Sequence, residues 1–192
     1  VLMPGAPDAK PTAFDVKRSK GFEGMASSKD GSKLYALLEG ALWNEAAKAY
    51  ENVGGKQYLR VLEFDVKSEQ WTGRHWKYVL EANHHAIGDF NMIDGNMGLI
   101  IERDNGEGTA DKACPEGQKR TDCFHDLAKF KRVYKVEMSD ANVGGEIRKV
   151  GYIDLMNIQD PNRLARKPLT NGVLTFPFFT IENVDVVDDK HI

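Results

Sequence analysis

The chain repeats one phrase of sequence, and this repeat limits the folds it can adopt more than any other feature. Residues 21–26 (GFEGMA) precede an Asp-Gly turn and an apolar run that ends in Glu39. Residues 86–91 (AIGDFN) precede a second Asp-Gly turn and an apolar run that ends in Glu102. Residues 180–184 (TIENV) begin a third copy. Repeats on this scale are typical of propellers and other stacked arrays, in which each unit buries its apolar face against a neighbour.

Short runs rich in β-branched and aromatic residues, separated by Gly, Asp and Asn turns, predict the strands. They form two groups of four and the start of a third: residues 24–27, 34–38, 59–66 and 75–80; residues 90–93, 98–103, 132–137 and 147–153; and residues 180–187. Four-stranded units of this kind build propeller blades. We therefore expect an all-β fold, a β-propeller of four-stranded blades, with about two complete blades and the start of a third in this chain.

The repeat also sets the expected domain boundaries. Residues 1–20 carry three prolines and no periodicity, which indicates an extended N-terminal arm. The propeller portion is expected over residues 21–192, with one blade at 21–85, a second at 86–156 and a partial blade at 176–192. Three insertions separate strands or blades, at residues 43–55, 106–129 and 157–175, and residues 41–50 favour a short helix.

The number of repeats is smaller than a closed propeller needs. Propellers close with about four to eight blades, and an unpaired blade edge inside one promotes aggregation. We therefore expect the remainder of the propeller to come from missing sequence or from a second chain.

Composition excludes several classes of partner. The 192 residues are 41% hydrophobic and 29% charged, with a net charge of −3. This charge is too small to favour nucleic acid or an anionic membrane surface as a partner. No apolar run reaches the length of about 18 residues that a transmembrane helix needs.

Two cysteines flank a polar stretch in the second insertion. Cys114 and Cys123, even with His125 nearby, offer too few ligands for a zinc site. The spacing favours a disulfide across a long loop and hence an oxidising compartment. The alternative is a pair of free thiols in a mobile loop.

One acid occupies the equivalent position at the start of each unit: Glu23, Asp89 and Glu182. The first strand of a blade lines the central channel, so these acids are expected to converge. Converging carboxylates repel one another unless a cation lies among them or some of them are protonated, and oxygen ligands suit Ca²⁺ or Mg²⁺ better than zinc. The alternative is that each acid caps backbone amides of its own blade.

A second group of charged residues, Glu102, Arg103 and Asp104, ends a strand and opens a long loop, and Glu39 holds the matching position in the first blade. Loops at strand ends often carry function, and an arginine beside acids can bind phosphate. The alternative is an internal ion pair at a turn. His84 and His85 precede the second copy of the phrase and offer a general acid or a metal ligand, although adjacent histidines in a loop are more often simply exposed.

Several catalytic signatures are absent from the sequence. It contains no Gly-x-Ser-x-Gly elbow, no His-Glu-x-x-His, no P-loop and no dinucleotide fingerprint. Serine-esterase chemistry therefore has no support.

The chain resembles the phytase-like family, whose members are also described as having the esterase-like activity of phytase. The motifs that carry the resemblance are residues 21–26, 34–40 (LYALLEG), 60–65 (RVLEFD), 87–89 (IGD), 101–105 (IERDN) and 180–184. The similarity extends from about residue 20 to residue 192. It implies a secreted or periplasmic β-propeller that acts on phosphate esters.

The resemblance and the charged residues together predict a secreted hydrolase of small phosphoric esters. The expected catalytic residues are Glu102, Arg103 and Asp104. The expected ligands of a divalent metal, Ca²⁺ ahead of Mg²⁺, are Glu23, Glu39, Asp89 and Glu182. Two alternatives remain open: a non-catalytic propeller that binds a ligand or serves structure, its acids stabilising the blades, and a half-propeller that works only within a complex.

Overall fold

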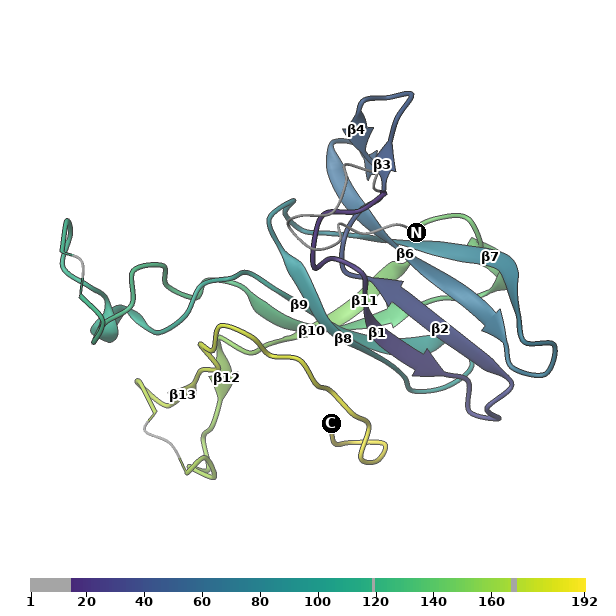
Figure 1. Cartoon of the computed structure of the whole chain (residues 1–192). Coiled ribbons are helices and arrows are strands. Elements are labelled where there is room, and N and C mark those ends of the chain that lie inside the picture. Colours follow the sequence, from purple (N-terminus) through teal and green to yellow (C-terminus); the bar gives the residue numbers. More distant parts are fainter. Residues whose placement is uncertain (1–14, 119, 167–168) are drawn as a thin grey trace.

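The computed structural model describes residues 15–118, 120–166 and 169–192, and the elements in this part of the chain are thirteen β-strands and two short 3-10 helices (Figure 1). The expected all-β fold is confirmed. The predicted N-terminal arm lies outside the described residues except for residues 15–20.

The first sheet is antiparallel and contains β1 (Phe22–Ser27), β2 (Lys33–Leu38), β6 (Lys56–Asp65) and β7 (Gln70–Val79), in that order. The two-residue strand β5 (Asn52–Val53) also pairs with β6. The turn between β1 and β2 follows from its sequence. Asp30 Oδ1 accepts hydrogen bonds from Ser28 and Ser32, and Gly31 adopts a φ of 70°, which favours glycine.

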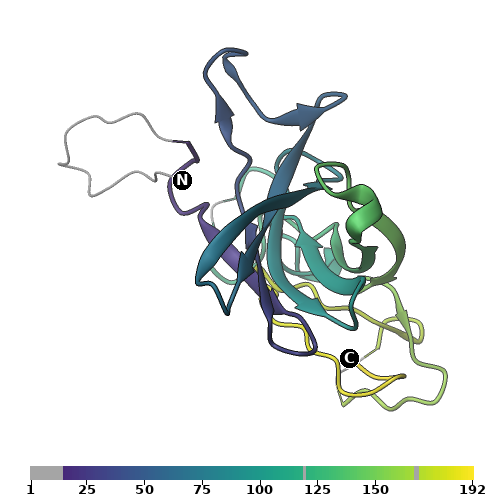
Figure 2. The ribbon, with the colours of Figure 1, turned by 90° about the vertical axis from the view of Figure 1, so that its right-hand side faces the viewer.

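The second sheet is also antiparallel and contains β8 (Ala86–Met92), β9 (Met97–Arg103), β10 (Lys131–Glu137) and β11 (Arg148–Asp154), in that order. It meets the first sheet along β1 and β8 (Figure 2). Gly24 permits this approach, because a Cβ atom there would lie 2.8 Å from the backbone nitrogen of Phe90. The eight strands predicted for the two repeats are thus all present.

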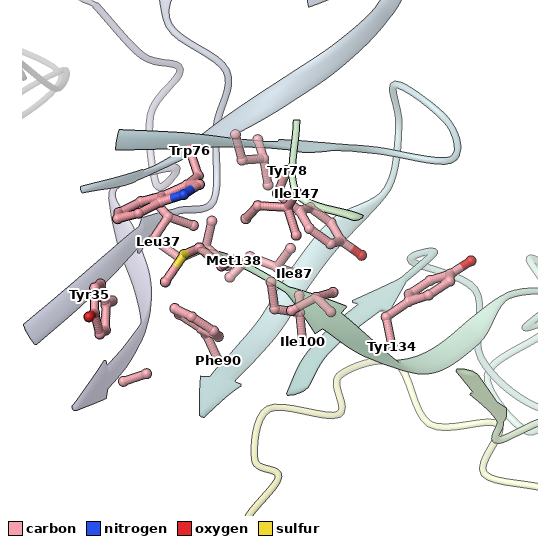
Figure 3. Close-up of a cluster of buried hydrophobic side chains, with 14 of the residues drawn as sticks. Tyr35, Leu37, Trp76, Tyr78, Ile87, Phe90, Ile100, Tyr134, Met138 and Ile147 are labelled. Carbon is pink, nitrogen blue, oxygen red and sulfur yellow. The ribbon is translucent and has the colours of Figure 1, made fainter. Parts of the chain in front are cut away.

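One hydrophobic core joins the two sheets (Figure 3). Leu37 and Trp76 of the first sheet are buried with Phe90 and Ile100 of the second. Trp76 also donates a hydrogen bond from Nε1 to the backbone oxygen of Ser139, 2.9 Å away. Burial of these apolar side chains is the main force that holds the sheets together.

The C-terminal segment, residues 176–192, differs from the expected strand pair. No strand is assigned over residues 180–187, so that prediction is wrong. The segment nevertheless covers the second face of the second sheet, where Val184 packs with Leu99, Ile101 and Val133. A side-chain hydrogen bond from β8 binds the segment in place of strand pairing. Asn91 Nδ2 donates it to the backbone oxygen of Val184, 3.1 Å away.

The insertions leave the two sheets undisturbed. The helix predicted at residues 41–50 is wrong: β3 (Trp43–Asn44) and β4 (Ala49–Tyr50) pair as a short hairpin instead. Asn44 Oδ1 accepts the Ala47 N–H within the turn, and the Trp43 and Tyr50 rings meet edge to face across the strands. Both contacts favour a hairpin over a helix.

The second and third insertions are equally short of regular structure. The second carries the 3-10 helix η1 (Ala110–Lys112) and the predicted Cys114–Cys123 disulfide, which is confirmed. In Figure 1 it extends away from the sheets. The third insertion contains the paired strands β12 (Ile158–Gln159) and β13 (Val173–Leu174). Outside the insertions, the 3-10 helix η2 (Asp140–Asn142) lies between β10 and β11.

Candidate functional site

Glu23 and Asp89 both lie in irregularities of the strand pairing. The register between β1 and β2 shifts between Phe22 and Gly24, and the register between β8 and β9 shifts between Ile87 and Phe90. A bulge of this kind redirects a side chain and is common beside functional sites. The repeated phrase therefore encodes the same local irregularity with an acid in it twice.

The Asp89 carboxylate binds the C-terminal segment. Its Oδ2 atom accepts the backbone N–H of Val184 at 3.0 Å. Gly88 makes room for the same segment, since a Cβ atom there would lie 2.0 Å from the backbone oxygen of Ile181. In this structure Asp89 attaches the third copy of the phrase to the second.

Glu102 is fully buried and accepts hydrogen bonds from four donors. They are Tyr78 Oη at 2.8 Å, the Glu81 N–H at 2.7 Å, Lys149 Nζ at 2.9 Å and His85 Nδ1 at 2.9 Å. Burial acts to raise the pKa of Glu102, but hydrogen bonds from His85 and Lys149 and the charge of Lys149 outweigh it, so the pKa is lowered. An ionised Glu102 thus connects the last strands of both sheets.

Asp104 organises the base of the disulfide-bearing loop. Its Oδ2 atom accepts the N–H groups of Lys129 and Phe130 at 2.7 and 2.9 Å, and the ammonium of Lys131 lies 2.8 Å from Oδ1. Lys131 is fully buried and also donates to the backbone oxygens of Asp104 and Gly106. Desolvation acts to raise the pKa of Asp104, yet the bonds from Lys131 and Lys129 lower it overall.

The remaining predicted acids surround two cations. Glu39 Oε1 accepts a hydrogen bond from Lys20 Nζ at 2.8 Å, and Glu182 Oε1 lies 3.8 Å from Arg103 Nη2. Glu23 is near both pairs: partial burial raises its pKa, the charges of Glu39 and Glu182 raise it further, and those of Arg103 and Lys20 oppose the rise. We call Lys20, Glu23, Glu39, Arg103 and Glu182 the mixed-charge cluster.

Some N–H groups of Arg103 take part in no hydrogen bond among the described residues. The residue is only 5% exposed, and its Nη1 atom donates to Asn105 Oδ1 at 2.8 Å. Its buried Nε atom has no hydrogen-bond partner among the described residues, and the Glu182 oxygen is too distant from Nη2 for a hydrogen bond. The Nε and Nη2 groups form one edge of the planar guanidinium, which is suited to two oxygens of a carboxylate or phosphate.

A cavity of about 150 Å³ lies next to the mixed-charge cluster. Its lining includes Lys20 and Glu39 of the cluster, together with Asn105 and His85. Asn105 therefore contacts Arg103 and borders the cavity at once.

Comparison with known proteins identifies the family. The profile of the phytase-like family, described as "Esterase-like activity of phytase", matches residues 2–192. The chain belongs to the phytase-like family. No curated protein and no solved structure matches it significantly. In the described part of this phytase-like chain, no helix is long and apolar enough to cross a membrane.

The described residues do not suit a divalent cation. They contain no group of three or more His, Cys, Asp or Glu side chains arranged to hold a metal ion. The acids that do lie together, Glu23, Glu39 and Glu182, have Lys20 and Arg103 among them. These cations already offset the carboxylate charge, so we assign no metal to the mixed-charge cluster.

The structure thus divides the predicted site residues into two groups. Arg103, Glu23, Glu39 and Glu182 come together, whereas Asp89, Glu102 and Asp104 bind backbone amides and partners in the fold. Lys20 and Asn105 were not predicted as site residues from the sequence. Asn105 had a signal, since it closes the charged run IERDN, but nothing in the sequence joins Lys20 to Glu39.

Proposed function

We propose that this chain carries the phosphate-binding part of a hydrolase that acts on small phosphoric esters. One observation supports the proposal most: the buried Nε atom of Arg103 has no hydrogen-bond partner among the described residues, and the Nη2 atom beside it lies 3.8 Å from Glu182 Oε1, too far for a hydrogen bond. An unsatisfied buried donor costs about 1–3 kcal/mol, and phosphate oxygens are well matched to a guanidinium edge. Membership of the phytase-like family makes a phosphoric ester the preferred anion.

The other members of the cluster have complementary roles in this proposal. Lys20 adds positive charge beside the phosphate, and charge stabilisation of this kind is a large term in phosphoryl transfer. Glu23 has a raised pKa, first because of partial burial and then because of the nearby acids. Glu182 is the group that an incoming phosphate displaces from the neighbourhood of Arg103.

None of these roles uses a metal ion. Ca²⁺, or Mg²⁺ as the weaker candidate, held by Glu23, Glu39, Asp89 and Glu182 stays a prediction from the sequence. Among the described residues, carboxylates interleaved with cations give it no support.

The proposal includes a fold and a location. We propose that the two sheets are neighbouring blades of a β-propeller and that further blades come from additional sequence or a second chain. Phe22, Met25 and Trp71 of the first sheet are 49%, 64% and 54% exposed, and another blade would bury such side chains. The Cys114–Cys123 disulfide supports a secreted or periplasmic protein.

The second candidate function is a non-catalytic propeller module. The observation that favours it is the use of Asp89, Glu102 and Asp104 by the fold: each accepts at least one backbone N–H group. In that case the mixed-charge cluster also serves structure alone.

The experiment that separates the two candidates is hydrolysis of p-nitrophenyl phosphate by the full chain and by Arg103→Gln. The hydrolase proposal predicts a loss in kcat/KM of about 100-fold or more. Arg148→Gln is the matched control, because Arg148 is a solvent-exposed arginine paired with Glu137 outside the cluster. Circular dichroism checks that both variants are folded. No hydrolysis by the unaltered chain would favour the non-catalytic module. Equal activity of the two variants would contradict the role of Arg103 in the hydrolase proposal.

A further inference from the structure

We propose that His85, oriented by Glu102, is the proton-accepting catalytic residue of this site and activates the water that attacks the phosphoric ester. The inference deepens the proposed function and rests on it.

Glu102 fixes which nitrogen of His85 carries a proton. The Nδ1 atom lies 2.9 Å from Glu102 Oε1, and the His85 and Glu102 side chains are 6% and 0% exposed. Glu102 is ionised, as its lowered pKa indicates, and a carboxylate can only accept. Nδ1 must therefore donate, which leaves Nε2 of the neutral ring as a hydrogen-bond acceptor.

The orientation of the ring is also fixed by packing. The imidazole stacks on Phe130 with ring centroids 4.3 Å apart and an interplanar angle of 29°. The ring of His84 meets it edge to face at 4.7 Å. Glu102 in turn cannot rotate freely, because Tyr78, Lys149 and the Glu81 amide all bind it. A general base held in this way keeps a constant direction toward its target.

His85 borders the same cavity as Lys20 and Asn105. Asn105 Oδ1 accepts a hydrogen bond from Arg103 Nη1, so Asn105 links the border of the cavity to the guanidinium of Arg103. A proton acceptor and a lysine thus border one space of about 150 Å³, with the arginine bound to a residue of its wall. This combination suits a phosphate monoester with a water molecule beside it better than it suits a neutral or cationic ligand.

The proposed step is balanced in atoms and charge. His85 Nε2 takes one proton from water as the water oxygen forms a bond to phosphorus and the ester P–O bond breaks. The departing oxygen takes a proton from solvent and leaves as an alcohol. The imidazolium then returns its proton to solvent, which restores the neutral ring and leaves the proton count unchanged.

Charged and titratable groups face the imidazole from several elements. Glu102 binds the ring directly, with Lys149 and Tyr78 behind it, and His84 lies alongside. Other groups line the cavity: Lys17, Lys20, Glu39 and Tyr50.

His191 provides a matched control. A carboxylate also binds its Nδ1 atom, since Asp188 Oδ1 lies 2.7 Å away, but the His191 side chain is 69% exposed and does not border the cavity. We would compare kcat for p-nitrophenyl phosphate of His85→Asn and His191→Asn, and add imidazole to His85→Ala. The inference predicts a loss of about 100-fold or more in His85→Asn, a loss of less than about threefold in His191→Asn, and partial rescue of His85→Ala by imidazole. If His85→Asn folds and retains activity similar to that of His191→Asn, the inference is overturned.

A second measurement does not depend on turnover. Nitrogen-15 NMR of the imidazole groups reports the tautomer, and inorganic phosphate is the added probe. The inference predicts a proton on Nδ1 of His85 and a phosphate-dependent shift of Nε2 that Arg103→Gln abolishes. A proton on Nε2, or no response to phosphate, contradicts it. If Arg103→Gln loses activity and His85→Asn keeps it, the proposed function stands and this inference fails. If the unaltered chain hydrolyses no ester, both fail.

Discussion

Glu39 and Glu102 end the second strand of their repeats, yet their surroundings differ. Glu102 has four hydrogen-bond donors in the interior, one of them the Glu81 amide. Glu39 is bound by the partly exposed Lys20. Glu23 and Asp89 differ in the same way, since Asp89 binds a backbone amide and Glu23 faces acids and cations. The sequence repeat therefore determines where an acid lies in each sheet but not which groups it binds.

Burial explains the difference between the two sheets. The second sheet packs on the first sheet with one face and on the C-terminal segment with the other, so its acids must find partners in the fold. The first sheet has large exposed side chains, including Met25 and Trp71. Glu23 of this sheet is exposed and can meet a ligand, whereas Glu39 is buried and is bound by Lys20.

The largest expected effect tests the buried charges of the second sheet. Lys131→Met removes the partner of Asp104 and leaves the carboxylate uncompensated. We expect a loss of about 3–5 kcal/mol in the free energy of unfolding, measured by urea denaturation. Lys135→Met is the control, because Lys135 lies on the same strand and is exposed. Equal losses in the two variants would show that the buried ion pair contributes no more to the free energy of unfolding than an exposed lysine does.

The next effect tests the attachment of the C-terminal segment. A Cβ atom at Gly88 would lie 2.0 Å from the Ile181 oxygen, a backbone atom that cannot rotate away. Gly88→Ala should cost about 1–3 kcal/mol and expose the segment to limited proteolysis. A Cβ atom at Gly151 would meet open space, so Gly151→Ala should change neither the free energy of unfolding nor the proteolysis of the segment. Protection of the segment in Gly88→Ala would mean that it does not lie against β8.

A smaller effect tests the opposite directions of two pKa shifts, the lowered pKa of Glu102 and Asp104 and the raised pKa of Glu23. The pKa values of Glu102 and Asp104 are lowered, so their stabilisation is present above their unfolded values of about 4 and is lost as the pH falls through the folded values. The pKa of Glu23 is raised, so its contribution is present below about pH 4 and is lost as the pH rises through the folded value. Glu23→Gln should therefore gain stability relative to the parent only as the pH rises above about 5. A relative gain at lower pH would contradict the sign, and urea midpoints between about pH 3 and 7 measure it.

The smallest expected effect concerns metal. Because Lys20 and Arg103 stand among the acids of the mixed-charge cluster, Ca²⁺ or EDTA should shift the melting temperature by less than about 1 °C. A calcium-dependent rise of several degrees would instead restore the carboxylate metal site predicted from the sequence.

Local pattern was sufficient for the strands and for the acid in each bulge. Runs of β-branched and aromatic residues between Gly, Asp and Asn turns located all eight strands of the two sheets, and the spacing of Cys114 and Cys123 indicated their disulfide. The hairpin of β3 and β4 was mistaken for a helix because its aromatic contact crosses the turn.

The partners of the acids were not predictable in the same way. Lys20 and Glu39, or Glu102 and Lys149, meet only after the strands are packed. The sequence alone therefore indicates which acids are repeated, but their chemistry depends on contacts between distant segments.

The most direct test of this division is the free energy of unfolding of Glu23→Gln and Glu102→Gln, measured by urea denaturation at pH 7. We expect a loss of about 3 kcal/mol or more for Glu102→Gln, because a neutral amide cannot accept all four hydrogen bonds that the buried carboxylate accepts. We expect a change within about 0.5 kcal/mol for Glu23→Gln. Equal losses, or a larger loss for Glu23→Gln, would contradict the division of the repeated acids into those that hold the fold and those available to a ligand.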